Sequence, residues 1–70
     1  MREFSISGHD FIPLCDLLKA ANLTASGGEA KHLIAEGKVQ VDGAVETRKR
    51  CKIRAGQLVE FQGQKVRVTA

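Results

Sequence analysis

The segment Asn22–Val45, NLTASGGEAKHLIAEGKVQVDGAV, decides how this chain folds. Ser26 and Glu29 have the spacing of a capping box, in which the Ser26 hydroxyl accepts the N–H of residue 29 and Glu29 reaches back to the N–H of Ser26. Gly37 suits the left-handed conformation that ends many helices. The pattern predicts a helix that starts at this box and runs to Glu36. Its apolar face consists of Ala30, Leu33 and Ile34.

A short strand and a tight turn follow this helix. Val39 and Val41 alternate with polar neighbours, which predicts a strand with one apolar face. Asp42-Gly43 is a strong signal for a hairpin turn. Residues 44–46 then form the returning strand, so the segment as a whole predicts a helix, a glycine stop, a strand and a hairpin.

The residues before this segment predict a strand and a first helix. Residues 3–7 alternate in polarity and favour a short edge strand, and residues 7–10 have turn composition. Pro13 suits the first turn of a helix, where its missing N–H is not needed. We expect this helix over about residues 13–21. Its apolar face consists of Leu14, Leu17, Leu18 and Ala21.

The residues after the segment predict two more strands, over 58–61 and 65–68, each preceded by a turn that contains glycine. With 70 residues, the chain has the size of a single domain, residues 1–70. The fold class predicted is α+β, with two short helices packed on a small, mostly antiparallel sheet. Apolar neighbours suggest that the aromatic residues Phe4, Phe11 and Phe61 all occupy the core.

Positive charge gathers in the second half of the chain. Residues 1–30 carry a net charge of −2 and residues 31–70 a net charge of +5. Residues 47–54 hold five cations and no acid, and such a surface attracts a polyanion. If this stretch is extended, Arg48, Arg50, Lys52 and Arg54 share one face at a spacing of about 6.6 Å, which could match successive phosphates. Lys49 lies on the other face. The alternative is a solvated face that keeps the protein soluble.

Other residues could extend this basic face. Ser26 and Gly27 present backbone N–H groups at the positive end of a helix, where a phosphate can bind. The alternative is that the serine only caps the helix. Lys31, His32 and Lys38 could join the patch, and ordinary surface roles are the alternative for each.

Several classes of function are not supported by the sequence. His9, Cys15, His32 and Cys51 lack the paired spacing of zinc ligands, so we expect no metal and no cofactor. The sequence shows no recognisable pair of a nucleophile and a base, so we expect that the protein is not an enzyme. No apolar run has the length of a signal peptide or a membrane span, so we expect a cytoplasmic protein with reduced thiols. With all three aromatics assigned to the core, recognition should rest on phosphates and RNA shape.

The motifs together resemble a known family. After the apolar run Leu14 to Leu18 comes the spacing Ser26-x-x-Glu29-Ala30-x-x-Leu33-Ile34-x-x-Gly37-x-Val39-x-Val41-Asp42-Gly43. This pattern is similar to that of the S4-type RNA-binding domain, or αL motif. This domain occurs in a small-subunit ribosomal protein, some pseudouridine synthases, some tRNA synthetases and a ribosome-associated heat-shock protein. The resemblance covers about residues 12–61. The chain also resembles small free-standing bacterial proteins of the YbcJ type, which share the Ser-Gly-Gly-Glu-Ala run.

The resemblance implies an RNA-binding surface on the second helix and the strand after it. Many family members have arginine where this chain has Gly27, and Arg-Leu-Asp where it has Pro13-Leu14-Cys15-Asp16. The basic stretch must therefore carry more of the binding. We expect non-enzymatic binding of structured RNA, such as rRNA or tRNA. Two alternatives stay open: a protein-interaction module that docks on an acidic, ribosome-associated partner, and an accessory domain that has lost its enzyme.

Overall fold

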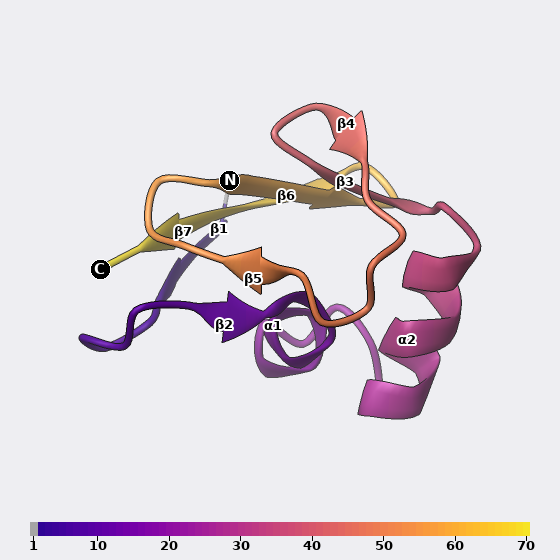
Figure 1. Ribbon diagram of the computed structural model, residues 1–70, viewed down its shortest axis with the longest axis horizontal. Helices are drawn as coiled ribbons and strands as arrows, with labels where there is room; N and C mark the ends of the chain where they lie inside the picture. Colours follow the sequence, from indigo (N-terminus) through magenta and orange to yellow (C-terminus); the bar gives the residue numbers. More distant parts are fainter. Residues whose placement is uncertain (1) are drawn as a thin grey trace.

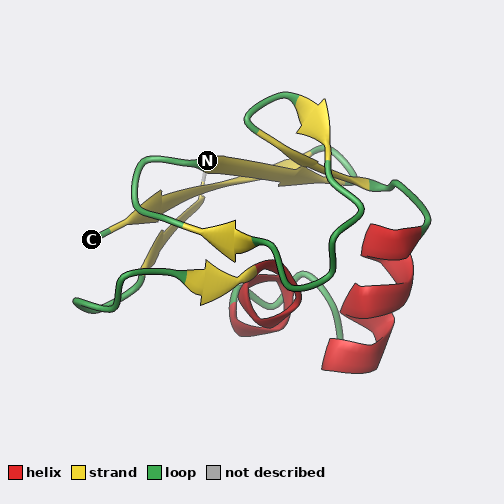
Figure 2. Ribbon diagram, in the orientation of Figure 1, coloured by secondary structure: helices red, strands yellow, loops and turns green. Residues whose placement is uncertain are grey.

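The computed structural model describes residues 2–70, which form two helices and seven short strands (Figures 1 and 2). In chain order the elements are β1 (Arg2–Ser5), β2 (Ile12–Pro13), α1 (Leu14–Ala20), α2 (Gly27–Ala35), β3 (Val39–Val41), β4 (Ala44–Val45), β5 (Lys52–Ile53), β6 (Leu58–Phe61) and β7 (Gln64–Thr69). The α+β class predicted from the sequence is confirmed.

Five of the strands form one sheet in the order β1-β7-β6-β3-β4, and β2 pairs with β5 in a separate two-stranded ladder. Every pairing is antiparallel except that of β1 with β7, which is parallel. The first strand is an edge strand, as predicted. The β2–β5 pair could not be predicted from the sequence, because it joins residues about forty positions apart through only two residues of each strand.

The core lies between the sheet and the helices. Most of the predicted apolar faces are confirmed, since the leucines of α1 and Ala30 and Ile34 of α2 are fully buried. Ala21, which follows α1, and Leu33 are half-buried. Burial of one such leucine or isoleucine stabilises the fold by roughly 2 kcal/mol. From the strands the core receives Val39, Ile53, Val59, Phe61 and Val68.

Helix α2 has caps at both ends. The hydroxyl of Ser26 accepts the N–H of Glu29 at 3.2 Å, as the capping box requires. The Glu29 carboxylate, however, accepts the N–H of Ala25 at 3.2 Å instead of that of Ser26. Gly37 has φ +79°, its N–H donates to Ile34 O, and the next N–H donates to the carbonyl of residue 33. This is a Schellman motif, which ends the helix and turns the chain into β3.

The predicted Asp42-Gly43 turn joins β3 to β4, with φ of +52° and +84°. Both values are positive, as a type I′ turn requires. Asp42 also fastens this hairpin to the start of β6, because its carboxylate accepts the N–H of Leu58 at 2.9 Å and the side-chain amide of Gln57 at 3.1 Å. These hydrogen bonds lower the pKa of Asp42 below its ordinary value.

Burial corrects the aromatic assignment: Phe61 is buried and Phe4 packs against the core, but Phe11 is 36% exposed. The core assignment of Phe11 was therefore wrong. Pro13 is also placed differently, since it has an extended conformation and precedes α1 instead of lying in its first turn. Pro13 belongs to β2, which pairs with β5, and Phe11 directly precedes this strand.

Candidate nucleic-acid interface

The basic stretch begins as a loop that is fastened to helix α1. The N–H of Leu14 donates to Cys51 O at 2.9 Å, and the N–H of Cys15 donates to Lys49 O at 3.1 Å. Helix α1 has no side-chain cap at this end, so the carbonyls of the loop satisfy N–H groups that would otherwise lack partners. The loop backbone therefore faces the helix.

The single extended row of four cations that the sequence suggested is wrong. Residues 48–51 form a turn, in which the N–H of Cys51 donates to Arg48 O at 3.2 Å. The alternation holds only for residues 52–54, where Ile53 is buried and the two flanking cations are exposed. The turn nevertheless leaves the same four cations together. An open hollow of about 500 Å³ is lined by Arg48, Arg50, Cys51, Lys52 and Arg54, and we name it the basic hollow.

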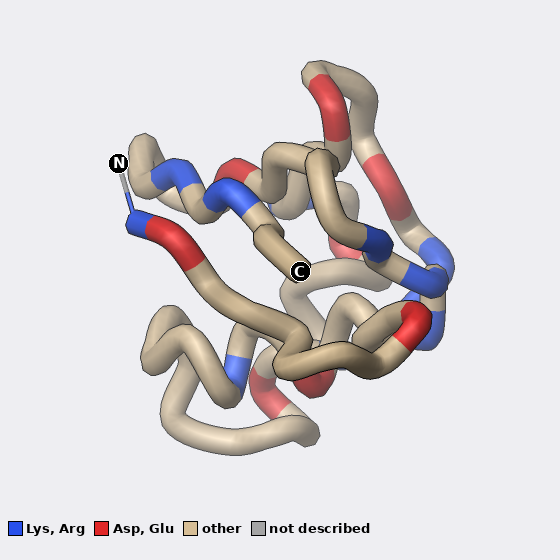
Figure 3. Tube along the Cα trace, turned by 90° about the vertical axis from the view of Figure 1, so that its left-hand side faces the viewer, with Lys and Arg blue, Asp and Glu red and all other residues tan. Residues whose placement is uncertain are grey.

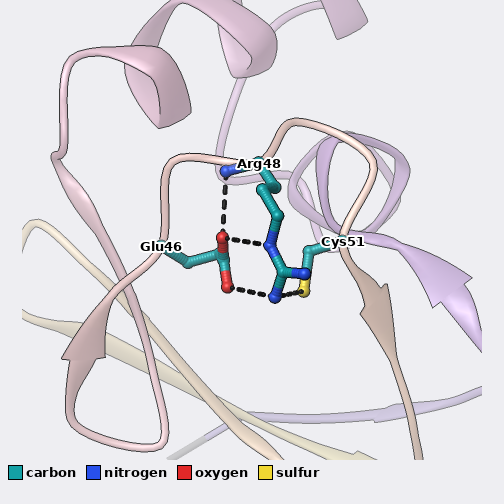
Figure 4. Close-up of polar contacts among 3 residues, drawn as sticks. All are labelled: Glu46, Arg48 and Cys51. Atoms are coloured by element: carbon teal, nitrogen blue, oxygen red, sulfur yellow. Dashed lines mark hydrogen bonds and ion pairs between the residues drawn. The ribbon is translucent and has the colours of Figure 1, made fainter.

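Arg48 is the one cation of the basic hollow that an acid neutralises (Figure 4). Its guanidinium donates to both carboxylate oxygens of Glu46, at 3.0 and 3.1 Å, and its backbone N–H donates to the same group at 2.9 Å. These bonds to Arg48 lower the pKa of Glu46 to about 2, and the carboxylate in turn raises the pKa of Arg48. The sequence stretch 47–54 looked free of acids only because Glu46 stands just before it.

The Sγ atom of Cys51 lies 3.7 Å from the guanidinium of Arg48. Burial, followed by the nearby Glu46 carboxylate, raises the pKa of this thiol above its ordinary value. A raised pKa keeps the thiol protonated, so Cys51 lines the basic hollow as a neutral side chain. Cys15 is buried, and both cysteines are free.

The remaining cations of the stretch are exposed and available. Lys49, Arg50, Lys52 and Arg54 all reach solvent. Among residues 2–70, ion pairs form only between Arg48 and Glu46 and between His32 and Glu36. Four positive side chains therefore lie on or beside the basic hollow without an acidic partner. Such an arrangement attracts the successive phosphates of a nucleic acid.

Helix α2 and the loop that follows β4 lie at the same end of the molecule in Figure 1. Lys31, His32 and Lys38 are exposed. The Nε2 atom of His32 lies 3.2 Å from Oε2 of Glu36 one turn further on, so this histidine has a local partner. At the N-terminus of α2, Ser26 is exposed and Gly27 is half-buried, with open space where a side chain of residue 27 would begin.

A second, smaller set of cations lies elsewhere. Arg2 and Lys65 line an open hollow of about 390 Å³ together with Gly63 and Gln64. Arg67 donates to Gly56 O at 2.7 Å, which ties β7 to the turn before β6. In Figure 3 most of the blue segments lie in two groups on opposite sides, one at the right of the view and one near the N-terminus at the left. The positive charge after the hairpin is thus not all on one face.

Two further observations concern other kinds of site. Within residues 2–70, no three histidine, cysteine or acidic side chains come together as metal ligands would. None of the helices in this part of the chain has the length and apolar character to cross a membrane.

Comparison with known proteins identifies the family. The profile of the S4 domain matches residues 4–69, a longer stretch than the resemblance in the sequence suggested. The chain belongs to the S4 domain family. Across its whole length it is 59% identical to the YbcJ proteins of Escherichia coli (strain K12) and Shigella flexneri, and the match covers 100% of each relative.

Solved structures agree with this assignment to the S4 domain family. The solution structure of YbcJ from E. coli, which is described as revealing an αL motif involved in RNA-binding, has a TM-score of 0.78 and 58% identity. The match covers 100% of this chain and 89% of that one. The 30S ribosomal protein S4e from Thermoplasma acidophilum shares the fold at a TM-score of 0.68 and 22% identity, over 81% of this chain and 30% of that one.

Proposed function

We propose that this S4 domain protein is a non-enzymatic, cytoplasmic RNA-binding protein that holds structured RNA, such as rRNA or tRNA, through phosphate contacts. The observation that carries the proposal is the basic hollow, where Arg50, Lys52 and Arg54 meet solvent without acidic partners. The RNA-binding αL motif described for the YbcJ structure supports the same function.

The mechanism is electrostatic. Each lysine or arginine that neutralises a phosphate releases a condensed counterion, so affinity depends steeply on salt. The loop is anchored through its carbonyls to α1, which restrains the backbone that carries the cations before RNA arrives. Such preorganisation lowers the entropy lost on binding.

Further contacts outside the basic hollow belong to the same proposal. Lys49 is exposed in the loop, and Lys31 and Lys38 are exposed on and after α2. Ser26, Gly27 and His32 would complete the surface on α2. Arg48 has a different role from the other cations, because Glu46 neutralises it and holds the loop in shape.

The test is a titration of the protein with a tRNA and with a hairpin fragment of rRNA across a series of salt concentrations. The four unpaired cations predict a slope of log K against log salt near −3.6, from four contacts at about 0.9 each. A slope near zero, or no binding at low salt, would refute the proposal. Binding that is strong for an acidic protein and absent for RNA would favour a protein-interaction module instead.

A further inference from the structure

Phe11 is an aromatic side chain on the surface, at the edge of the basic hollow. It is 36% exposed, while the other two phenylalanines lie in or against the core. Two of the cations that line the basic hollow stand over its ring: Lys52 Nζ lies 5.0 Å from the ring centroid and Arg54 Cζ lies 6.0 Å from it. An aromatic ring next to unpaired cations is the combination that single-stranded nucleic acids meet in proteins.

The β2–β5 ladder explains why these side chains meet. Ile12 pairs with Ile53, and Pro13 pairs with Lys52. If this antiparallel register continues by one residue, Phe11 stands opposite Arg54 and diagonal to Lys52. Side chains at paired positions point to the same face of a sheet. Ile53 is fully buried on the inner face, so Phe11 and its two cations share the outer face.

We propose that Phe11 is a stacking platform for an unpaired nucleobase, and that Lys52 and Arg54 bind the phosphates beside it. This inference rests on the proposed RNA-binding function and refines its ligand: a structured RNA that carries an unpaired nucleotide next to a helix. Bases that leave a helix stack on aromatic side chains and on guanidinium planes, and Phe11 and Arg54 offer both.

The competing role for the ring is to hold the two cations in place by cation–π attraction. The two roles predict different dependences on the RNA. A positioning role supports every phosphate contact, whichever base lies nearby. A stacking role strengthens binding only when the RNA presents a free base.

The experiment compares three hairpin RNAs: a fully paired stem, the same stem with one unpaired adenosine, and that stem with an abasic residue at the unpaired position. The wild-type protein should bind the RNA with the unpaired adenosine about 5- to 100-fold more tightly than the other two. Phe11→Leu keeps an apolar side chain but removes the aromatic face, so it should abolish this preference. Phe11→Trp should retain it.

A second readout is the fluorescence of the unpaired base itself. When 2-aminopurine replaces the unpaired adenosine, stacking on Phe11 should change its fluorescence on binding to the wild-type protein and not on binding to Phe11→Leu. Circular dichroism of each variant controls for folding. Equal affinity of the wild-type protein for all three RNAs, with the salt slope intact, would overturn the stacking role and leave the proposed function standing. An equal loss for all three RNAs in Phe11→Leu would assign the ring to positioning and also overturn it. No binding of any RNA by the wild-type protein would overturn both.

Discussion

Replacing Arg50 with alanine tests the basic hollow most directly. Arg50 is exposed, lines the basic hollow and has no ion-pair partner among the described residues. Its loss should remove one phosphate contact and lower the steepness of the salt dependence by about 0.9. If the contact contributes nothing near 1 M salt, this slope corresponds to about an eightfold loss of affinity at about 0.1 M, or about 1.2 kcal/mol.

The matched control is Lys65→Ala. Lys65 is also an exposed cation, so its loss changes the net charge by the same amount, but it lines the other hollow with Arg2. We expect this variant to retain nearly the full slope. Fluorescence anisotropy with a labelled tRNA at several salt concentrations measures both variants. If Arg50→Ala and Lys65→Ala lose the same slope, net charge and not the basic hollow governs binding. If neither loses any slope, Arg50 makes no phosphate contact. Either result refutes the reasoning.

Three further predictions concern the frame that holds the site. Since the pKa of Glu46 is about 2, its bond to Arg48 should be complete above about pH 5 and lost as the pH falls toward 2; an NMR titration of the carboxyl group checks this, and a midpoint above pH 4 would contradict it. Gly37→Ala should destabilise the protein by about 1 kcal/mol in urea unfolding, because residue 37 has a positive φ that an L-residue with a Cβ adopts only at a cost; an unchanged midpoint would show that the Schellman turn adapts. Ser26→Ala should cost about 1 kcal/mol by removing the cap of α2, whereas Ser26→Asp, which can also cap, should not.

The sequence predicted those parts of the fold that depend on neighbouring residues. Helix α2 and the β3–β4 hairpin follow from a capping serine, a stop glycine and an Asp-Gly turn, all of which act within a few positions. The parallel pairing of β1 with β7 was not predicted, since it joins the two ends of the chain and no local signal marks it.

The sequence predicted which cations form the candidate site but not how they are arranged in space. The cations around Arg50 do line one hollow, as their clustering suggested. Their extended row was wrong, because the carbonyls of residues 49 and 51 turn toward α1. The neutralisation of Arg48 depends on an acid just outside the basic stretch. The exposure of Phe11 depends on the β2–β5 pairing, which brings distant residues together.

The attachment of the loop to helix α1 determines which partner must adapt on binding. Moving the backbone at Lys49 or Cys51 would break the hydrogen bonds that the N–H groups of Leu14 and Cys15 donate to this loop. Leu14 and Cys15 are buried residues of the core. An induced rearrangement of the loop would therefore disturb the folded interior. We expect the polynucleotide to bend toward the protein, so that RNAs are selected by how easily they deform.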